Sequence, residues 1–227
     1  MANADQQVDT WLHALGSALA ARDIDAAGAL FGEQCFWRDF VAFTWNLKTS
    51  EGRDAIKAML RATLATTGPR DWQREGAARE KDGVTQAWIS FKTEHGHGKG
   101  QVRLQGGRGW TLFTTLQGLH GFEEKAGPTR ELGTQHGVFK NRETWLERKE
   151  REAKALGHIE QPYCLIVGGG QAGIALAARL RRLDVPTIVI EKNERAGDSW
   201  RKRYRSLCLH DPVWYDHMPY LPFPNHW

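Results

Sequence analysis

The chain has 227 residues with 41% hydrophobic and 26% charged residues, and its net charge of +4 is spread along its length. This composition is that of an ordinary folded globular protein, and the mild charge without a long basic stripe argues against nucleic-acid binding. No apolar run approaches the ~18 residues that a membrane span needs. The cysteines Cys35, Cys164 and Cys208 form no C-x-x-C pair and no signal peptide begins the chain, so we expect no metal site and a cytoplasmic location.

Apolar residues at helical spacing predict three helices in the first 70 residues. The first buries one face through residues of the segment 8–19. The second follows Asp23, which is a good N-cap. The third runs from about Arg53 to the break at residues 66–70.

After residue 70 the hydrophobic pattern changes from helical spacing to the pattern typical of strands. We expect one strand near residues 35–45 and four more within residues 71–122, with the clearest turns at 81–83 and 106–109. Helices followed by an antiparallel sheet indicate an α+β domain over residues 5–122.

This order of elements is similar to the nuclear-transport-factor-like (SnoaL-like) cone fold. The resemblance implies an apolar pocket inside a curved sheet, with ligand binding or homodimer formation as possible roles. Asp39 and His120 are the natural candidates for a proton acceptor in such a pocket. The expected pocket residues are Trp37, Asp39, Phe43, Trp45, Trp88, Trp110, Phe113 and His120.

A linker is predicted at residues 123–160. Its first part, 123–140, is polar and rich in glycine, and a charged helix follows with Asn141 as N-cap and Gly157 as C-cap. Glutamates precede basic residues by four positions in this helix, which favours ion pairs Glu147–Arg151 and Glu150–Lys154. We interpret the helix as a solvated spacer between two domains.

Residues 161–227 begin with a β-α-β pattern. An apolar run at 164–167 predicts a strand buried on both faces of a parallel sheet, a helical pattern follows the glycines, and a second apolar run occupies 187–190. The loop between the first strand and the helix is G-x-G-x-x-G, and Glu191 comes 23 residues after Gly168.

This spacing is typical of dinucleotide binding. Gly168 permits the tight turn, Gly170 lets a diphosphate approach the backbone, and Gly173 lets the helix pack closely on the strand. The helix N-terminus offers free N–H groups to the phosphates. Glu191 can accept hydrogen bonds from a ribose diol and would disfavour a 2′-phosphate.

The residues after Glu191 carry further features. They are the run 197–200 ending in tryptophan, the segment 204–212 (YRSLCLHDP) and the PFP run at 222–224. In these features residues 160–227 resemble the flavin-dependent monooxygenases of the dimethylaniline-monooxygenase and plant YUCCA type.

The resemblance implies FAD as the cofactor and NADPH as the reductant. In such enzymes reduced flavin and O2 form a C4a-hydroperoxide, which transfers one oxygen atom to a small-molecule substrate. No catalytic side chain is assigned. Together with the glycine loop, the resemblance implies cofactor contacts at Gly168, Gly169, Gly170, Gln171, Ala172, Gly173, Glu191, Lys192, Ser199, Trp200, His210 and Asp211.

The sequence carries no second glycine loop for NADPH, and two strands fall short of the five or six of a doubly wound sheet. We therefore expect residues 161–227 to be the N-terminal part of an FAD-binding Rossmann domain, with exposed apolar surface and no monooxygenase activity by itself. Two alternatives stay open. One is another FAD/NAD(P)H oxidoreductase, such as a disulfide reductase; the other is a non-catalytic small-molecule-binding or dimerisation module.

Overall fold

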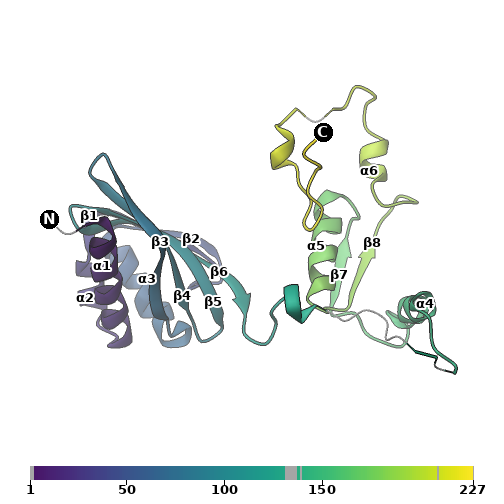
Figure 1. Cartoon of the computed structure of the whole chain (residues 1–227), viewed down its shortest axis with the longest axis horizontal. Helices are drawn as coiled ribbons and strands as arrows, with labels where there is room; N and C mark the ends of the chain where they lie inside the picture. Colours follow the sequence, from purple (N-terminus) through teal and green to yellow (C-terminus); the bar gives the residue numbers. More distant parts are fainter. Residues whose placement is uncertain (1–2, 131–136, 139, 209, 227) are drawn as a thin grey trace. The chain divides into compact units, whose positions relative to one another are not determined.

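The computed structural model describes residues 3–130, 137–138, 140–208 and 210–226. The chain divides into two compact units, unit 1 (Met1–Glu123) and unit 2 (Glu124–Trp227). Unit 1 is α+β and unit 2 contains a β-α-β element (Figure 1). The predicted fold class, a cone-shaped α+β domain followed by the start of a Rossmann domain, is confirmed.

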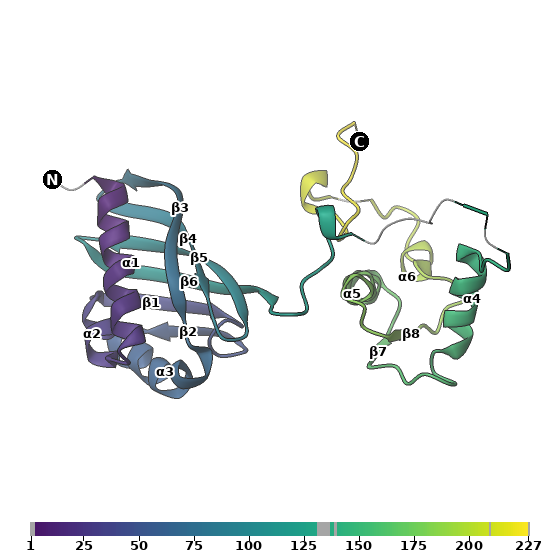
Figure 2. The same cartoon turned by 60° about the horizontal axis from the view of Figure 1, so that its bottom comes forward.

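Three helices lie on one face of a curved sheet in unit 1 (Figures 1 and 2). They are α1 (Ala4–Ala20), α2 (Ile24–Ala29) and α3 (Gly52–Thr67). Asp23 caps α2 as predicted, because its side chain accepts from the Ala26 N–H at 2.8 Å. Gly68 ends α3 in the left-handed conformation with φ 50°, which suits glycine.

The sheet of unit 1 has six strands in the order β2-β1-β6-β5-β4-β3. β1 pairs with β6 in parallel, and the other neighbours are antiparallel. The strand β2 was missed by the sequence analysis. The bounds are β1 (Phe31–Phe40), β2 (Leu47–Glu51), β3 (Arg70–Lys81), β4 (Val84–Lys92), β5 (Gly96–Gln105) and β6 (Arg108–Leu119).

The space between helices and sheet is filled by packed rings. Trp37 lies 5.9 Å from Phe31 and 5.0 Å from Phe43, centroid to centroid, and Trp72 stacks on Phe91 at 4.6 Å. Trp37 and Phe43 are thus buried core residues. Trp45 and Trp88, also expected in a pocket, are 57% and 58% exposed.

Asp39 is fully buried, and its acceptor capacity is used within the fold. Its carboxylate accepts from the main-chain N–H groups of Phe43 and Thr44, from the Thr44 hydroxyl and from the Thr114 hydroxyl at 2.9 Å. The Thr114 hydroxyl in turn accepts from the Trp37 indole N–H. His120 is exposed at the end of β6. Asp39 therefore joins β1 to β6, and its prediction as a proton acceptor is not supported by this geometry.

In unit 2, the helix α4 (Trp145–Ala155) starts later than predicted. Thr144, not Asn141, is its N-cap, and Glu147 completes a capping box by accepting from the Thr144 N–H at 2.7 Å. Because Glu147 is engaged there, Arg151 pairs with Glu143 instead of Glu147. The C-cap of α4 is Leu156, where Gly157 was expected.

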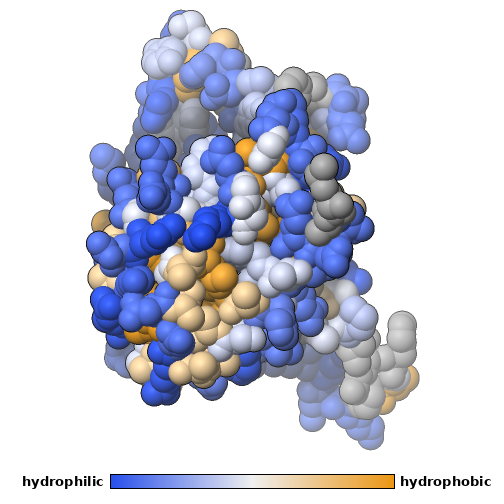
Figure 3. Space-filling model, turned by 90° about the vertical axis from the view of Figure 1, so that its left-hand side faces the viewer, coloured by the Kyte–Doolittle hydropathy of each residue, from blue (hydrophilic) through white to orange (hydrophobic). Residues whose placement is uncertain are grey.

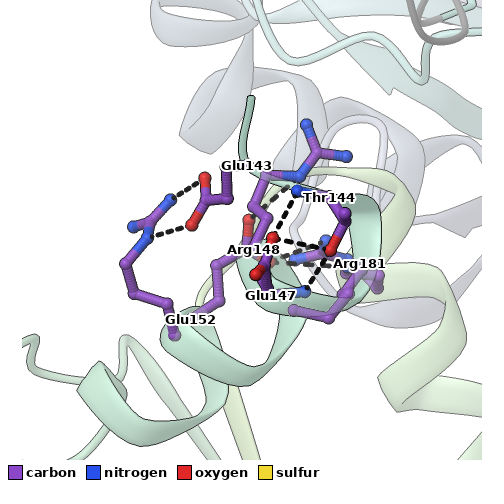
Figure 4. Close-up of polar contacts among 8 residues, drawn as sticks. Glu143, Thr144, Glu147, Arg148, Glu152 and Arg181 are labelled. Carbon is purple, nitrogen blue, oxygen red and sulfur yellow. Dashed lines mark hydrogen bonds and ion pairs between the residues drawn. The ribbon is translucent and has the colours of Figure 1, made fainter. Parts of the chain in front are cut away.

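The helix α4 also contacts the β-α-β element, although none of its residues is buried. Arg181 on α5 (Gln171–Arg182) forms an ion pair with Glu152 of α4 at 3.4 Å (Figure 4). A Cβ at Gly157 would lie 2.8 Å from the Ile188 Cδ1 atom, so the segment after α4 packs on β8 (Thr187–Ile190).

The β-α-β element comprises β7 (Cys164–Val167), α5 (Gln171–Arg182) and β8 (Thr187–Ile190). β7 and β8 are parallel, and Ile166 is buried. Leu165 and Val167 point to the other face and are 55% and 82% exposed. The prediction that 164–167 is buried on both faces is therefore wrong here, because α5 covers only one face. The expectation of exposed apolar surface is confirmed.

Elsewhere the visible surface is largely polar. In Figure 3 hydrophilic residues dominate the face shown and surround a smaller apolar area. Within the described ranges, no helix is long and apolar enough to cross a membrane, and no group of three or more His, Cys, Asp or Glu side chains could hold a metal ion.

Candidate functional site

The glycine loop lies where β7 turns into α5, and each of its glycines has a distinct geometry. Gly168 has φ 106°, a conformation that L side chains rarely adopt. A Cβ at Gly173 would lie 1.9 Å from the carbonyl oxygen of Gly168, so α5 can approach the loop only with glycine there. A Cβ at Gly170 would meet only the Ser199 hydroxyl at 3.7 Å. Gly170 therefore presents an open backbone.

The N-terminus of α5 offers unused hydrogen-bond donors. The first four N–H groups of a helix have no partner within it, and the first bond of α5 runs from Ile174 N–H to the Gly170 carbonyl. In the part of the chain that the structure describes, the N–H groups of Gly170, Gln171, Ala172 and Gly173 donate to no other group. Such a row of amides is suited to an anion.

The Glu191 carboxylate is turned toward this loop. Its Oε2 accepts from the Gly169 N–H at 2.6 Å, and its Oε1 accepts from the main-chain N–H and the side-chain amide of Asn193. The pKa of Glu191 is below its ordinary value of 4.5, first because of the Asn193 main-chain N–H and then because of the Gly169 N–H. The carboxylate is therefore ionised near neutral pH and lies one strand away from the free amides.

One loop amide is thus occupied by a side chain, since Gly169 donates to Glu191. Gly169 was predicted as one of the cofactor contacts, together with the free amides of the helix N-terminus. The structure instead divides the loop: Gly169 fixes the acid, while the amides of 170–173 are open.

The segment after β8 brings further predicted residues to the loop. α6 (Asp198–Arg201) is anchored by Asp198, which is 3% exposed and pairs with Arg201 at 2.9 Å and Arg195 at 3.3 Å. This turn sets Ser199 next to Gly170. Lys192 is exposed.

A cavity of about 600 Å³ adjoins the first turn of α5, which is within the usual size of small-molecule sites. The Arg203 guanidinium stacks over the Trp200 ring at 5.0 Å. Four of the residues that line the cavity were predicted as cofactor contacts, namely Gln171, Trp200, His210 and Asp211. The other lining residues were not predicted. The lining residues are Gln171, Ile174, Trp200, Arg203, Tyr204, Leu207, Cys208, His210, Asp211, Asp216, Met218 and Phe223.

The remaining differences between prediction and structure concern a few single residues. Leu209, part of the segment 204–212, lies outside the described residues, as do 131–136 and 139 of the linker. Arg203, which is not among the predicted contacts, lines the cavity. Asn193 was missed, although its place two residues after the acid was a usable signal.

Comparison with known families agrees with a nucleotide site in this segment. Residues 166–221 match the family described as NAD(P)-binding Rossmann-like domain. The segment is 42% identical over 65 residues to indole-3-pyruvate monooxygenase YUCCA1 of Oryza sativa subsp. japonica, covering 28% of this chain and 16% of that protein. It is 38% identical over 55 residues to an uncharacterized CzcO-like oxidoreductase of Geobacillus kaustophilus, covering 24% and 16%. The chain thus matches about one sixth of the length of these relatives.

Solved structures are similar over about half of the chain. One is a cystatin-like domain of unknown function from Nostoc punctiforme, with a TM-score of 0.43 and 13% identity, covering 52% of this chain and 80% of that chain. Another is a ketosteroid isomerase-like protein from Erwinia carotovora atroseptica, with a TM-score of 0.42 and 8% identity, covering 51% and 98%.

Proposed function

We propose that unit 2 binds FAD through its glycine loop and belongs to an oxidoreductase of the flavin monooxygenase type. The observation that carries this proposal is the set of open amides at residues 170–173 beside the ionised Glu191 carboxylate. The amides suit a diphosphate, and the carboxylate suits an unphosphorylated ribose. The similarity to a named monooxygenase and to an oxidoreductase supports this class of reaction.

In this proposal the described residues bind and orient the cofactor. The loop amides would hold the diphosphate, Glu191 would hold the ribose, and the cavity beside Trp200 and His210 would take the remainder. Bound FAD would supply the oxygen chemistry, with NADPH as the reductant bound elsewhere in the protein. The free cysteines support a reducing compartment such as the cytoplasm.

The test is a titration of the chain with FAD, followed by flavin fluorescence. Saturable quenching that ADP reverses is expected, because ADP is the half of FAD that the loop and Glu191 would hold. For the oxygen-inserting reaction, NADPH oxidation coupled to O2 uptake is measured on a full-length protein that carries this segment. Absence of FAD binding in both proteins would rule the proposal out.

A second role is proposed for unit 1, as a homodimerisation module. The outer face of its sheet carries Phe40, Leu47 and Trp88, which are 44%, 53% and 58% exposed. Phe40 and Leu47 lie opposite each other on β1 and β2, and exposed apolar side chains of this size suit a contact with a second copy of the sheet. Light scattering should give twice the chain mass, and Trp88→Arg should give the single mass. Trp145→Arg, at an exposed residue of unit 2, is the matched control. A monomeric wild-type chain contradicts this role.

A further inference from the structure

A chain of hydrogen bonds runs from α6 to the glycine loop through Glu191. The Lys202 Nζ donates to Asn193 Oδ1 at 2.8 Å, and Asn193 Nδ2 donates to Glu191 Oε1 at 2.6 Å. Glu191 Oε2 then accepts from the Gly169 N–H at 2.6 Å. The three side chains thus link the end of α6, the loop after β8 and the loop before α5.

The chemistry of these groups allows only one arrangement. A lysine ammonium only donates hydrogen bonds and an ionised carboxylate only accepts them. Asn193 lies between the two, so its oxygen must face Lys202 and its NH2 group must face Glu191. Lys202 thereby fixes which way the Asn193 amide points, and Asn193 fixes the plane of the carboxylate.

The two carboxylate oxygens are left in different states. A carboxylate oxygen has about two acceptor positions. Oε1 accepts both the main-chain N–H of Asn193 at 2.8 Å and its side-chain amide, so it is saturated. Oε2 accepts from the Gly169 N–H, and the main-chain N–H of Lys192 makes a weaker contact with the carboxylate. The oxygen next to the glycine loop is therefore the one that can still take a hydroxyl.

We propose that Asn193 and Lys202 are positioning residues that hold Glu191 so that its Oε2 takes a ribose hydroxyl of the bound dinucleotide. This rests on the proposed dinucleotide site and adds to it the device that presents the acid. Neither residue needs to touch the ligand. The pKa of Glu191 is lowered first by the main-chain N–H of Asn193 and then by the Gly169 N–H, and the side-chain amide of Asn193 also lowers it, which agrees with the arrangement.

The experiment measures two quantities on the whole chain. The first is ADP affinity near neutral pH by calorimetry, and the second is the pKa of Glu191, followed through the amide shift of Gly169 in NMR spectra. The variants are Asn193→Ala, Asn193→Asp, Asn193→Ser and Lys202→Met. Arg205→Met removes an exposed cation of the same segment and is the matched control.

Asn193→Ala should weaken ADP binding roughly tenfold, the usual loss for one hydrogen bond to a charged group. Asn193→Asp should weaken it further and raise the pKa of Glu191, because a second carboxylate replaces the donor. Asn193→Ser keeps a short donor and should recover part of the affinity. Lys202→Met should act in the same direction as Asn193→Ala, and Arg205→Met should match the wild type.

Two outcomes distinguish the failures. A wild-type chain that binds neither ADP nor FAD overturns the proposed function, whatever the NMR titration gives. A wild-type chain that binds ADP, with unchanged affinity and Glu191 pKa in Asn193→Ala and Lys202→Met, overturns only the positioning role.

Discussion

Replacing Gly173 by alanine should damage both the fold of unit 2 and its ligand site. The added Cβ would lie 1.9 Å from the Gly168 carbonyl oxygen, 3.0 Å from its carbon and 3.4 Å from Ile166 Cγ2. Real Cβ atoms essentially never approach closer than 3.0 Å. Helix α5 or the loop must therefore move by about 1 Å, and close-packed interiors resist such shifts.

The size of the effect follows from overpacking. Forcing an extra carbon into a packed contact costs about 1–3 kcal/mol, and here the obstacle is main chain, which cannot rotate away. The same shift moves the open amides of 170–173 relative to Glu191. FAD affinity should then fall by roughly tenfold or more, since ~1.4 kcal/mol is a factor of ten.

Gly170→Ala is the matched comparison, because its Cβ would meet only Ser199 Oγ at 3.7 Å. Gly170→Ala should lower the free energy of unfolding by only about 0.5 kcal/mol, because it changes the N-cap residue of α5. It nevertheless adds a methyl group where the diphosphate would approach. Hydrogen exchange of the amides in β7 and α5 reports the fold, and flavin fluorescence reports binding. Equal exchange in Gly173→Ala and the wild type would refute the packing argument.

Three other changes test separate features. Glu191→Gln should weaken ADP binding roughly tenfold. Because the pKa of Glu191 is lowered in the fold, the stability that the carboxylate adds is present above pH 4.5 and is lost as pH falls through the native pKa. In urea denaturation over a pH series, the variant should therefore lose less stability toward acid pH than the wild type. Asp39→Asn should destabilise unit 1 by about 3 kcal/mol in urea denaturation followed by tryptophan fluorescence, because buried donors lose their acceptor; an unchanged midpoint contradicts the linking role. Thr144→Ala should cost α4 about 1 kcal/mol and speed amide exchange in its first turn, whereas Thr144→Ser should not.

The parts of the fold that depend on local pattern were predictable from sequence. The cap at Asp23, the turn at 81–83 and the β-α-β element all follow from residue type and spacing. The capping box of α4 was also visible, as Thr144 followed three residues later by Glu147, but Asn141 was chosen instead. β2 was missed because a strand of five residues with one apolar side chain, Leu47, has too little pattern to stand out.

Features that depend on distant residues could not be predicted in this way. The role of Asp39 depends on Thr114, which is 75 residues away and reaches it through the parallel pairing of β1 with β6. The exposed face of β7 depends on what packs against it, and an apolar run alone does not reveal that. The link from Lys202 to Glu191 depends on side-chain directions across three segments.

The most direct test of the dinucleotide site is an amide NMR titration of the chain with ADP. Binding on the α5 N-terminus predicts that the largest shifts occur at residues 170–173, with a smaller shift at Gly169, and that 2′,5′-ADP causes far weaker changes. ADP binding that leaves the amides of 170–173 unmoved, or equal binding of the 2′-phosphorylated nucleotide, would contradict it.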